Sequence, residues 1–119
     1  MEKTFAIDFD GVIHTYSKGF HDGTIYDKPI EGAKDVLSFL VSEGYRVAIL
    51  TARLHPKHAD VAGQRANILK WLAKNGFKEG VHYHELTNNK PPAVAYVDDR
   101  AIVFKNWEQT ITDLKQLIS

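Results

Sequence analysis

Apolar residues along this chain form short continuous runs that are separated by stripes with helical spacing. The runs at residues 4–7, 45–50 and 93–97 predict strands, because a short, mostly apolar run is typical of a parallel strand that is covered on both faces. Residues 81–86 predict one more short strand, and residues 102–104 predict a short strand at a sheet edge.

Apolar residues with i, i+3, i+4 spacing predict three helices. Pro29 suits the start of the first helix and Gly44 its C-terminal cap, while Asn106 and Gln109 have capping-box spacing at the start of the last. Trp71 is expected to take part in packing. The predicted helices cover residues 29–44, 60–75 and 106–118. Their apolar stripes are Ala33, Val36, Leu37, Leu40 and Val41, then Ala62, Ala66, Leu69, Leu72 and Ala73, then Trp107, Ile111, Leu114 and Ile118.

The elements follow one another as strand, helix, strand, helix, strand, strand, helix. This order predicts an α/β fold with a mostly parallel sheet flanked by helices. A length of 119 residues is enough for one domain with a real core but not for two, so residues 1–119 are expected to form a single domain.

Charge balance, cysteine content and the length of the apolar runs limit the kinds of function that the chain can have. The 15 Lys and Arg residues balance the 15 Asp and Glu residues, which argues against bulk attraction to nucleic acid or to a membrane. The chain has no cysteine, which excludes disulfides, thiolate metal sites and a cysteine nucleophile. It has no apolar run of membrane-spanning length and no signal-peptide pattern, so we expect a cytoplasmic protein without a membrane partner.

Two acidic residues follow the first apolar run. The alternation of a strand directs Asp8 and Asp10 to the same side, with Phe9 opposite. Two carboxylates this close both stay charged only with a cation or other compensation. Gly11 then lets the backbone turn tightly or approach a ligand closely. A strand end followed by an ordinary turn would also explain these residues, so the rest of the chain decides.

Polar residues suited to the same chemistry follow two other predicted strands. Thr51 follows the second, Asp98 and Asp99 follow the strand at 93–97, and Lys90 lies in the turn before that strand. In a parallel sheet these ends share one edge. Four carboxylates without thiolates favour Mg²⁺, which also binds phosphate. A carboxylate can attack phosphorus to give an aspartyl phosphate, and a second can carry the proton of the leaving group.

In this order, the residues resemble the four motifs of the haloacid dehalogenase (HAD) superfamily of phosphohydrolases, over nearly the whole chain. Asp8-Phe9-Asp10-Gly11-Val12 resembles the first motif, Thr51 the second, Lys90 the third and Val97-Asp98-Asp99 the fourth. The resemblance implies a HAD-like, Rossmann-like three-layer sandwich and a magnesium-dependent phosphatase. An aspartate at position 10 favours phosphatase or phosphotransferase chemistry over the dehalogenase branch.

The resemblance also implies a role for each residue at the sheet edge. Asp8 would be the nucleophile and a magnesium ligand. Asp10 would be the general acid and base, with its backbone carbonyl on the metal. Thr51 would hydrogen-bond the phosphoryl group. The expected substrate-binding residues are Gly11, Thr51, Ala52, Arg53 and Lys90.

Lys90 would neutralise the phosphoryl group and orient the nucleophile. Asp98 would ligate magnesium directly, and Asp99 directly or through water. Lys90 lies only eight residues before Asp98, closer than in many members of the superfamily, so Lys78 is an alternative for the third motif.

The positions that usually carry a cap domain in this superfamily are short here. Residues 14–28 predict a flap beside the acids, and the chain between residues 51 and 90 is used by a helix and a strand. A capless site suggests a large phosphorylated substrate, with a polynucleotide end as the first candidate, or a partner or oligomerisation. Arg53 either reaches substrate phosphate or is an ordinary surface arginine.

Other interpretations stay open beside this one. His55 with His58 and His82 with His84 have spacings that could suit zinc, but a third ligand is missing. A group of basic residues could bind a polyanion, although a solvated helix face is the favoured account. This group consists of Lys57, Arg65, Lys70, Lys74 and Lys78.

A receiver-like signalling domain also uses acids, a threonine and a lysine around magnesium. It needs its phosphoacceptor aspartate on a middle strand, and here the expected middle strand ends in Thr51. A phosphate-binding module that does not turn over is a further alternative. Magnesium-dependent release of phosphate from an aryl phosphate would separate these from an enzyme.

Overall fold

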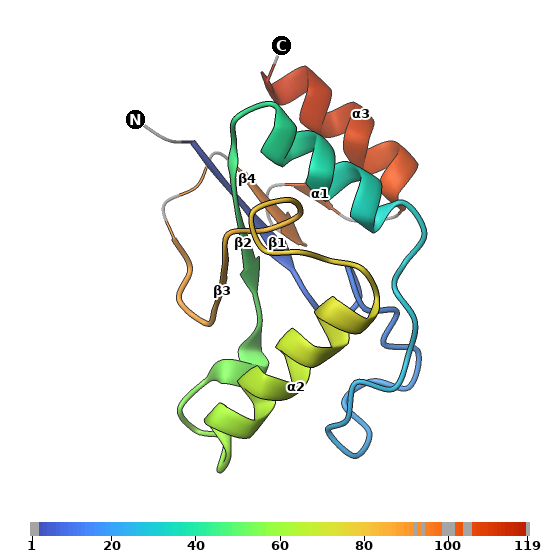
Figure 1. Ribbon diagram of the computed structural model, residues 1–119. Coiled ribbons are helices and arrows are strands. Elements are labelled where there is room, and N and C mark those ends of the chain that lie inside the picture. Colours follow the sequence, from blue (N-terminus) through green and yellow to red (C-terminus); the bar gives the residue numbers. More distant parts are fainter. Residues whose placement is uncertain (1–2, 92, 94, 99–101, 104–105, 119) are drawn as a thin grey trace.

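The computed structural model describes residues 3–91, 93, 95–98, 102–103 and 106–118, and within them a parallel sheet with helices beside it (Figure 1). The sheet has five strands in the order β3-β2-β1-β4-β5, and every neighbouring pair is parallel. The strands are β1 (Thr4–Asp8), β2 (Arg46–Leu50), β3 (Glu85–Thr87), β4 (Ala95–Asp98) and β5 (Ile102–Val103). The helices are α1 (Ala33–Ser42), the short 3₁₀ helix η1 (Ala52–Leu54), α2 (Val61–Lys74) and α3 (Trp107–Ile118).

The first strand of the chain is the central strand of the sheet. β1 pairs with β2 on one side and with β4 on the other, so that Ile7 is in register with Ile49 and with Val97. The expectation that the strand leading to Thr51 is the middle one is therefore wrong. Because the strands are parallel, the carboxyl ends of β1, β2 and β4 meet at one edge, where open α/β sheets place their sites.

The central strands are buried on both faces, which explains why they appear in the sequence as continuous apolar runs. Phe5, Ala6 and Ile7 of β1 are at most 1% exposed, and so are their neighbours in β2. The predicted stripe of α1 faces this core, with Ala33, Val36, Leu37 and Leu40 buried.

The first helix begins later than Pro29 predicts. Pro29 forms a bridge with His14, and the Ile30 N–H donates to the Ile13 carbonyl at 2.8 Å. The chain is therefore extended there, and α1 starts at Ala33 after Gly32, whose φ is 90°. Helix α1 lies beside α3 (Figure 1). A Cβ atom on Gly32 would lie 2.9 Å from the Cβ atom of Trp107 in α3, so glycine permits this close approach.

The range of the second helix is confirmed, but its predicted buried face is wrong. Helix α2 runs from Val61 to Lys74 and is capped by the Asp60 carboxylate, which accepts from the Gly63 N–H at 3.0 Å. Its buried residues are Ile68, Trp71 and Leu72. Four of the five stripe residues are exposed, namely Ala62, Ala66, Leu69 and Ala73. Alanine offers little apolar area, so the larger Trp71 and Ile68 decide which face is buried.

The second half of the chain follows the prediction with shifted boundaries. The strand expected at residues 81–86 is reduced to β3, and Val81 is 47% exposed. The edge position of β5 is confirmed. The predicted cap of α3 is confirmed as well, because the Asn106 side-chain oxygen accepts from the Gln109 N–H at 2.8 Å. None of the helices in the described part of the chain could cross a membrane.

Candidate active site

Asp8 lies at the carboxyl end of the central strand and is half-buried. Its Oδ1 atom accepts a hydrogen bond from the N–H of Phe9 at 3.0 Å. The same N–H also donates to the Leu50 carbonyl at the end of β2, at 3.0 Å. The backbone after Asp8 is thus held against β2, so the carboxylate stands at the sheet edge as predicted.

A tight turn follows β1 and brings Asp10 close to His14. The Phe9 carbonyl accepts from the N–H groups of Ile13 and His14, both at 2.9 Å, and the Gly11 N–H donates to the His14 carbonyl at 2.8 Å. Gly11 has a φ of +82°, where a side chain is strained. A Cβ atom there would meet nothing within 4 Å, so the backbone angle and not crowding calls for glycine.

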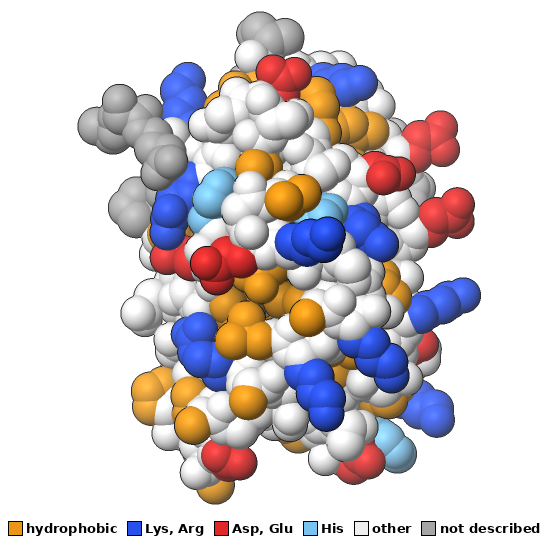
Figure 2. All heavy atoms as spheres, in the orientation of Figure 1, with side chains coloured by type: hydrophobic (Ala, Val, Ile, Leu, Met, Phe, Trp, Pro, Cys, Tyr) orange, Lys and Arg blue, Asp and Glu red, His pale blue; other side chains and the backbone are white. Residues whose placement is uncertain are grey.

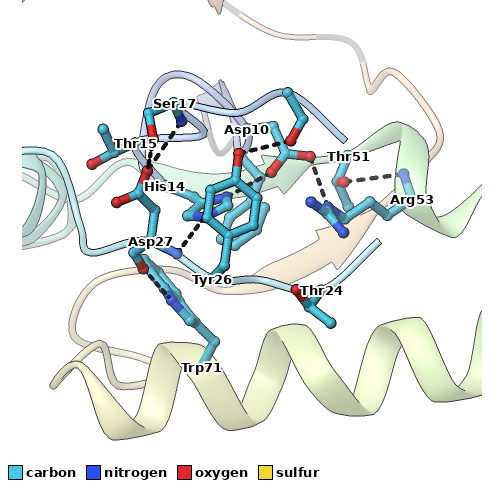
Figure 3. A network of polar contacts seen from close by, with 12 residues as sticks. Asp10, His14, Thr15, Ser17, Thr24, Tyr26, Asp27, Thr51, Arg53 and Trp71 are labelled. Carbon is cyan, nitrogen blue, oxygen red and sulfur yellow. Dashed lines mark hydrogen bonds and ion pairs between the residues drawn. The ribbon is translucent and has the colours of Figure 1, made fainter. Parts of the chain in front are cut away.

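The Asp10 carboxylate is held by a separate partner on each oxygen (Figure 3). Oδ1 lies 2.9 Å from Nδ1 of His14, and Oδ2 accepts from Nε of Arg53 at 2.8 Å. The side chains of His14 and Arg53 are 0% and 2% exposed, whereas that of Asp10 is 18% exposed. Two buried partners therefore fix a carboxylate that still reaches solvent.

Arg53 is buried, so its interpretation as a surface arginine is wrong. It lies in η1, and its Nη1 donates to the Gly23 carbonyl at 2.7 Å. Its guanidinium also lies 5.2 Å from the ring centroid of Phe20 and 5.8 Å from that of Tyr16, within cation–π range. Its Nη2 is buried and has no hydrogen-bond partner among the described residues. Whether Arg53 contacts a substrate remains a prediction.

Thr51 joins the ends of two strands at the same edge. It is 2% exposed, and its N–H donates to the Thr87 carbonyl at the end of β3, at 3.0 Å. Its hydroxyl oxygen accepts from the Arg53 N–H at 3.1 Å and so caps η1, where Ala52 is exposed. The hydroxyl keeps its own proton as a donor, which suits the predicted contact with a phosphoryl oxygen.

The segment expected to be a flap is tied to the rest of the fold. The Asp27 N–H donates to Nε2 of His14 at 3.1 Å, and the Trp71 indole N–H donates to the Asp27 carbonyl at 2.9 Å. Within residues 15–28, the Tyr26 hydroxyl donates to the Gly19 carbonyl at 2.7 Å. These bonds link the segment to the turn after β1 and to α2, so it forms a wall beside the acids.

Two residues of this wall have backbone angles that favour glycine. Tyr16 has a φ of 61° and His21 one of 51°, a conformation that costs roughly 1–3 kcal/mol per residue and persists only when the surroundings enforce it. Burial of the Tyr16 ring and then the Asp10 carboxylate raise the pKa of Tyr16 above its usual 10.0. Tyr16 therefore keeps its proton at neutral pH, next to the ion pair of Asp10 and Arg53.

The predicted magnesium ligands are only partly described. The register of Ile7 with Val97 places Asp98, the last residue of β4, next to Asp8 at the sheet edge. The Asp98 side chain and the whole of Asp99 lie outside the described residues. Among the described residues, no group of three or more His, Cys, Asp or Glu side chains could hold a metal. Asp8 and Asp98 thus end neighbouring parallel strands, and carboxylate oxygens are the ligands that a hard cation prefers.

Of the two lysines considered for the third motif, Lys90 follows β3 and Lys78 precedes it. The ammonium of Lys90 lies 4.4 Å from the ring centroid of Tyr96 in β4. The Lys78 backbone N–H donates to Nδ1 of His82 at 3.0 Å, in the turn that leads into β3. Because Lys90 lies three residues beyond Thr87, past the carboxyl end of β3, its position in the chain suits the site better.

The histidines considered for zinc have other contacts. Nδ1 of His55 accepts from the Lys57 N–H, and Nδ1 of His84 accepts from the Val47 N–H, at 3.1 and 3.0 Å. Burial and the nearby ammonium of Lys34 lower the pKa of His82 below 6.5. His58 stacks on Phe20, with ring centroids 6.0 Å apart. Three of these four rings thus accept a backbone N–H, and the fourth packs on Phe20.

His14 is a member of the site that none of the sequence motifs predicts. Asp10 and His14 are four residues apart, and this spacing is the one local signal that could have indicated the pair. The second partner of His14, the N–H of Asp27, lies 13 residues further along in a segment without periodicity.

Comparisons with protein-family models, with curated proteins and with solved structures found no match to this chain.

Proposed function

We propose that this protein is a magnesium-dependent phosphomonoester hydrolase of the HAD type, which acts through an aspartyl phosphate on Asp8. The observation that carries the proposal is the Asp10 carboxylate. It is held by two buried partners, two residues after Asp8, at the carboxyl end of the central strand. Membership of the superfamily, a three-layer sandwich, the lack of a cap domain and a cytoplasmic location are parts of the same proposal.

The chemistry proceeds in two displacements at phosphorus. Asp10 takes up a proton before the first displacement. A carboxylate oxygen of Asp8 then attacks the phosphorus atom, the bond to the leaving oxygen breaks, and the Asp10 carboxyl donates this proton to that oxygen. Asp10 then takes a proton from a water molecule, whose oxygen attacks the same phosphorus. The bond to Asp8 breaks, inorganic phosphate leaves and both aspartates return to their starting state.

The other site residues act on the charge of the phosphoryl group. The Thr51 hydroxyl and the backbone beside Gly11 and Ala52 would contact its oxygens, with Lys90 and Arg53 supplying positive charge. Asp8, the backbone carbonyl of Asp10, Asp98 and Asp99 would hold Mg²⁺. When bound, the ion neutralises developing negative charge on the phosphoryl oxygens.

A large phosphorylated substrate, with a polynucleotide end as the first candidate, is part of the proposal. It is supported by the exposed basic group around α2, which consists of Lys57, Arg65, Lys70, Lys74 and Lys78. Figure 2 shows Lys and Arg side chains spread over the face on which α2 lies, with hydrophobic side chains between them. The exposed Ala62, Ala66 and Leu69 also make association with a partner or a second copy compatible with this face.

A receiver-like or phosphate-binding domain without turnover is the second candidate. The observation that favours it is the position of Asp8 at the end of the central strand, where a receiver-like domain needs its phosphoacceptor. The two candidates differ in the fate of the phosphoryl group. An enzyme releases phosphate repeatedly, whereas a receiver-like domain holds it.

The test is release of p-nitrophenol from p-nitrophenyl phosphate with Mg²⁺ and with EDTA. The wild-type protein should turn over with Mg²⁺ only, and Asp8→Asn should lose activity by several orders of magnitude with its fold intact. Asp113→Asn is the matched control, because this aspartate lies in α3 and accepts from the Gln109 side chain at 3.0 Å. Asp8→Asn activity within about tenfold of the wild type would contradict the covalent mechanism.

A further inference from the structure

We propose that His14 is a positioning residue for Asp10, which fixes the carboxylate in the orientation needed for proton transfer. The inference rests on the proposed function, since it assigns Asp10 the role of proton donor and acceptor. Neither the motifs nor their spacing indicated His14. Its place follows from contacts on both sides of its ring (Figure 3).

The hydrogen bonds of His14 define which ring nitrogen carries the proton. A backbone N–H can only donate, and the Asp27 N–H points to Nε2 at 3.1 Å, so Nε2 accepts. In a neutral imidazole the proton is then on Nδ1. Nδ1 therefore donates to Oδ1 of Asp10, 2.9 Å away. The wall at residues 15–28 thereby sets the tautomer of the ring that binds Asp10.

The ring of His14 cannot easily turn away from this contact. It is fully buried and stacks on Phe9, with centroids 5.6 Å apart and the planes at 26°. The rings of Trp71, Tyr26 and Tyr16 surround it at centroid distances of 5.6, 5.3 and 5.8 Å. A ring packed on several sides holds Nδ1 in one place.

Arg53 completes the restraint on Asp10 from the opposite oxygen. Its Nε donates to Oδ2, and its own position is set by the Gly23 carbonyl of the same wall. With one donor on each oxygen, the carboxylate has one rotamer, and a lone pair on each oxygen remains for the reacting group. Because proton transfer needs the acid within hydrogen-bond reach of the leaving oxygen, a fixed rotamer speeds it.

Two substitutions separate the positioning role from a packing role. In His14→Asn the amide nitrogen takes the place of Nδ1, so the bond to Asp10 is kept and the contact with Asp27 is lost. In His14→Gln the longer side chain takes the place of Nε2, so the contact with Asp27 is kept and the bond to Asp10 is lost. Both variants lose the ring and its packing, which makes them matched controls for stability.

The kinetic readout compares an alkyl phosphate with p-nitrophenyl phosphate, whose leaving group departs without a proton. His14→Gln should lower kcat for the alkyl phosphate by at least about tenfold more than for the aryl phosphate, with little change in KM. His14→Asn should keep the wild-type ratio of the two substrates. Equal losses on both substrates in both variants would overturn the proposal and leave His14 a packing residue.

A readout that needs no turnover is the NMR spectrum of the free protein. The nitrogen shifts of His14 should show the proton on Nδ1, and the Hα–Hβ couplings of Asp10 should show a single rotamer. The couplings should become averaged in His14→Gln but not in His14→Asn. A proton on Nε2 in the wild type, or an unchanged Asp10 rotamer in His14→Gln, would overturn the proposal.

The kinetic and NMR readouts together distinguish a failure of the proposed function from a failure of the positioning role of His14. If the wild type shows the expected tautomer and rotamer but releases no phosphate with Mg²⁺, the proposed function fails and the positioning of Asp10 by His14 stands. If His14→Gln does not fold, the tautomer and rotamer of the wild type decide the matter.

Discussion

At the scale of single residues, the main feature of this molecule is a carboxylate with a buried partner on each oxygen. An ion pair with a buried arginine is costly to break from one side, because the remaining charge keeps no partner. Arg53 is 2% exposed and His14 is fully buried, and each makes one hydrogen bond to Asp10 and another to the wall. The side chain that we assign to proton transfer therefore also holds together the turn, η1 and the wall.

The first prediction concerns Asp10→Asn. Activity should fall much more with an alkyl phosphate than with p-nitrophenyl phosphate, because the alkyl leaving group requires a proton. The kcat/KM values of the two substrates measure this. Equal losses would assign Asp10 a purely structural role. The amide should also lower the free energy of unfolding, since its NH₂ group must face one of two donors, Nδ1–H of His14 or Nε–H of Arg53.

The positions of Asp8, Asp10 and Thr51 could be predicted because they depend on local pattern. Each follows a short apolar run, and parallel strands bring such ends to one edge. The partners of Asp10 could not be predicted in the same way. The contact of Arg53 with Gly23 spans 30 residues and involves a segment without any period, so its geometry depends on the complete fold.

At the scale of elements, the wall at residues 15–28 differs most from expectation. Many of its hydrogen bonds involve side chains, and such bonds leave no periodic signature in the sequence. The two donors of Ser17, its N–H and its hydroxyl, both bind Oδ2 of Asp27, at 3.0 and 2.7 Å. These bonds, the hydroxyl first, lower the pKa of Asp27 below its usual 3.8.

The second prediction follows from this lowered pKa. The folded state favours the ionised carboxylate, so the stabilisation by Asp27 is fully present above about pH 4 and is lost as the pH falls through the lowered pKa. The carboxyl carbon shift of Asp27, followed by NMR, should therefore titrate below 3.8. In Ser17→Ala, which keeps only the backbone donor, the midpoint should move up towards the usual value. Identical midpoints in the two proteins would contradict this account of the wall.

An element was predicted correctly where the residues that match the apolar period are also the residues that the fold buries. Helix α1 buries the stripe that its sequence predicts, and β5 lies at the edge of the sheet. Helix α2 fails this test because its alanines match the period but offer little area. The face of α2 that carries Trp71 is buried instead, and the Trp71 ring lies 5.3 Å from the Phe9 ring between centroids. Side-chain size, which a simple periodicity count ignores, decided the orientation.

At the scale of the whole molecule, charge is balanced overall but not evenly distributed. The formal net charge is 0 at pH 7, yet exposed basic residues gather on and next to α2, among them Arg65, Lys70 and Lys74. The wall joins this helix to η1 at the carboxyl edge, since the Trp71 indole N–H donates to the Asp27 carbonyl and Arg53 donates to the Gly23 carbonyl. A long anionic substrate could thus contact the basic face while its end lies at Asp8.

The third prediction is that substrate size matters. A phosphorylated oligonucleotide should exceed a nucleoside monophosphate in kcat/KM by about a hundredfold, a gain of roughly 3 kcal/mol from contacts outside the reacting group. The advantage should shrink at higher salt if the basic face contributes. Lys70→Gln is a suitable variant, with the exposed Lys3→Gln as its control. A small metabolite that outperforms every macromolecule would contradict the prediction.

The most direct test of the central claim is to look for the phosphoryl group on Asp8 itself. The protein is mixed with a phosphate ester and Mg²⁺, quenched in acid and examined by mass spectrometry. Our account predicts one added phosphoryl group, located on the peptide that contains Asp8, which is absent from Asp8→Asn and decays as phosphate is released. Turnover without any phosphorylated protein, or a phosphoryl group on another residue, would contradict the mechanism proposed for this site.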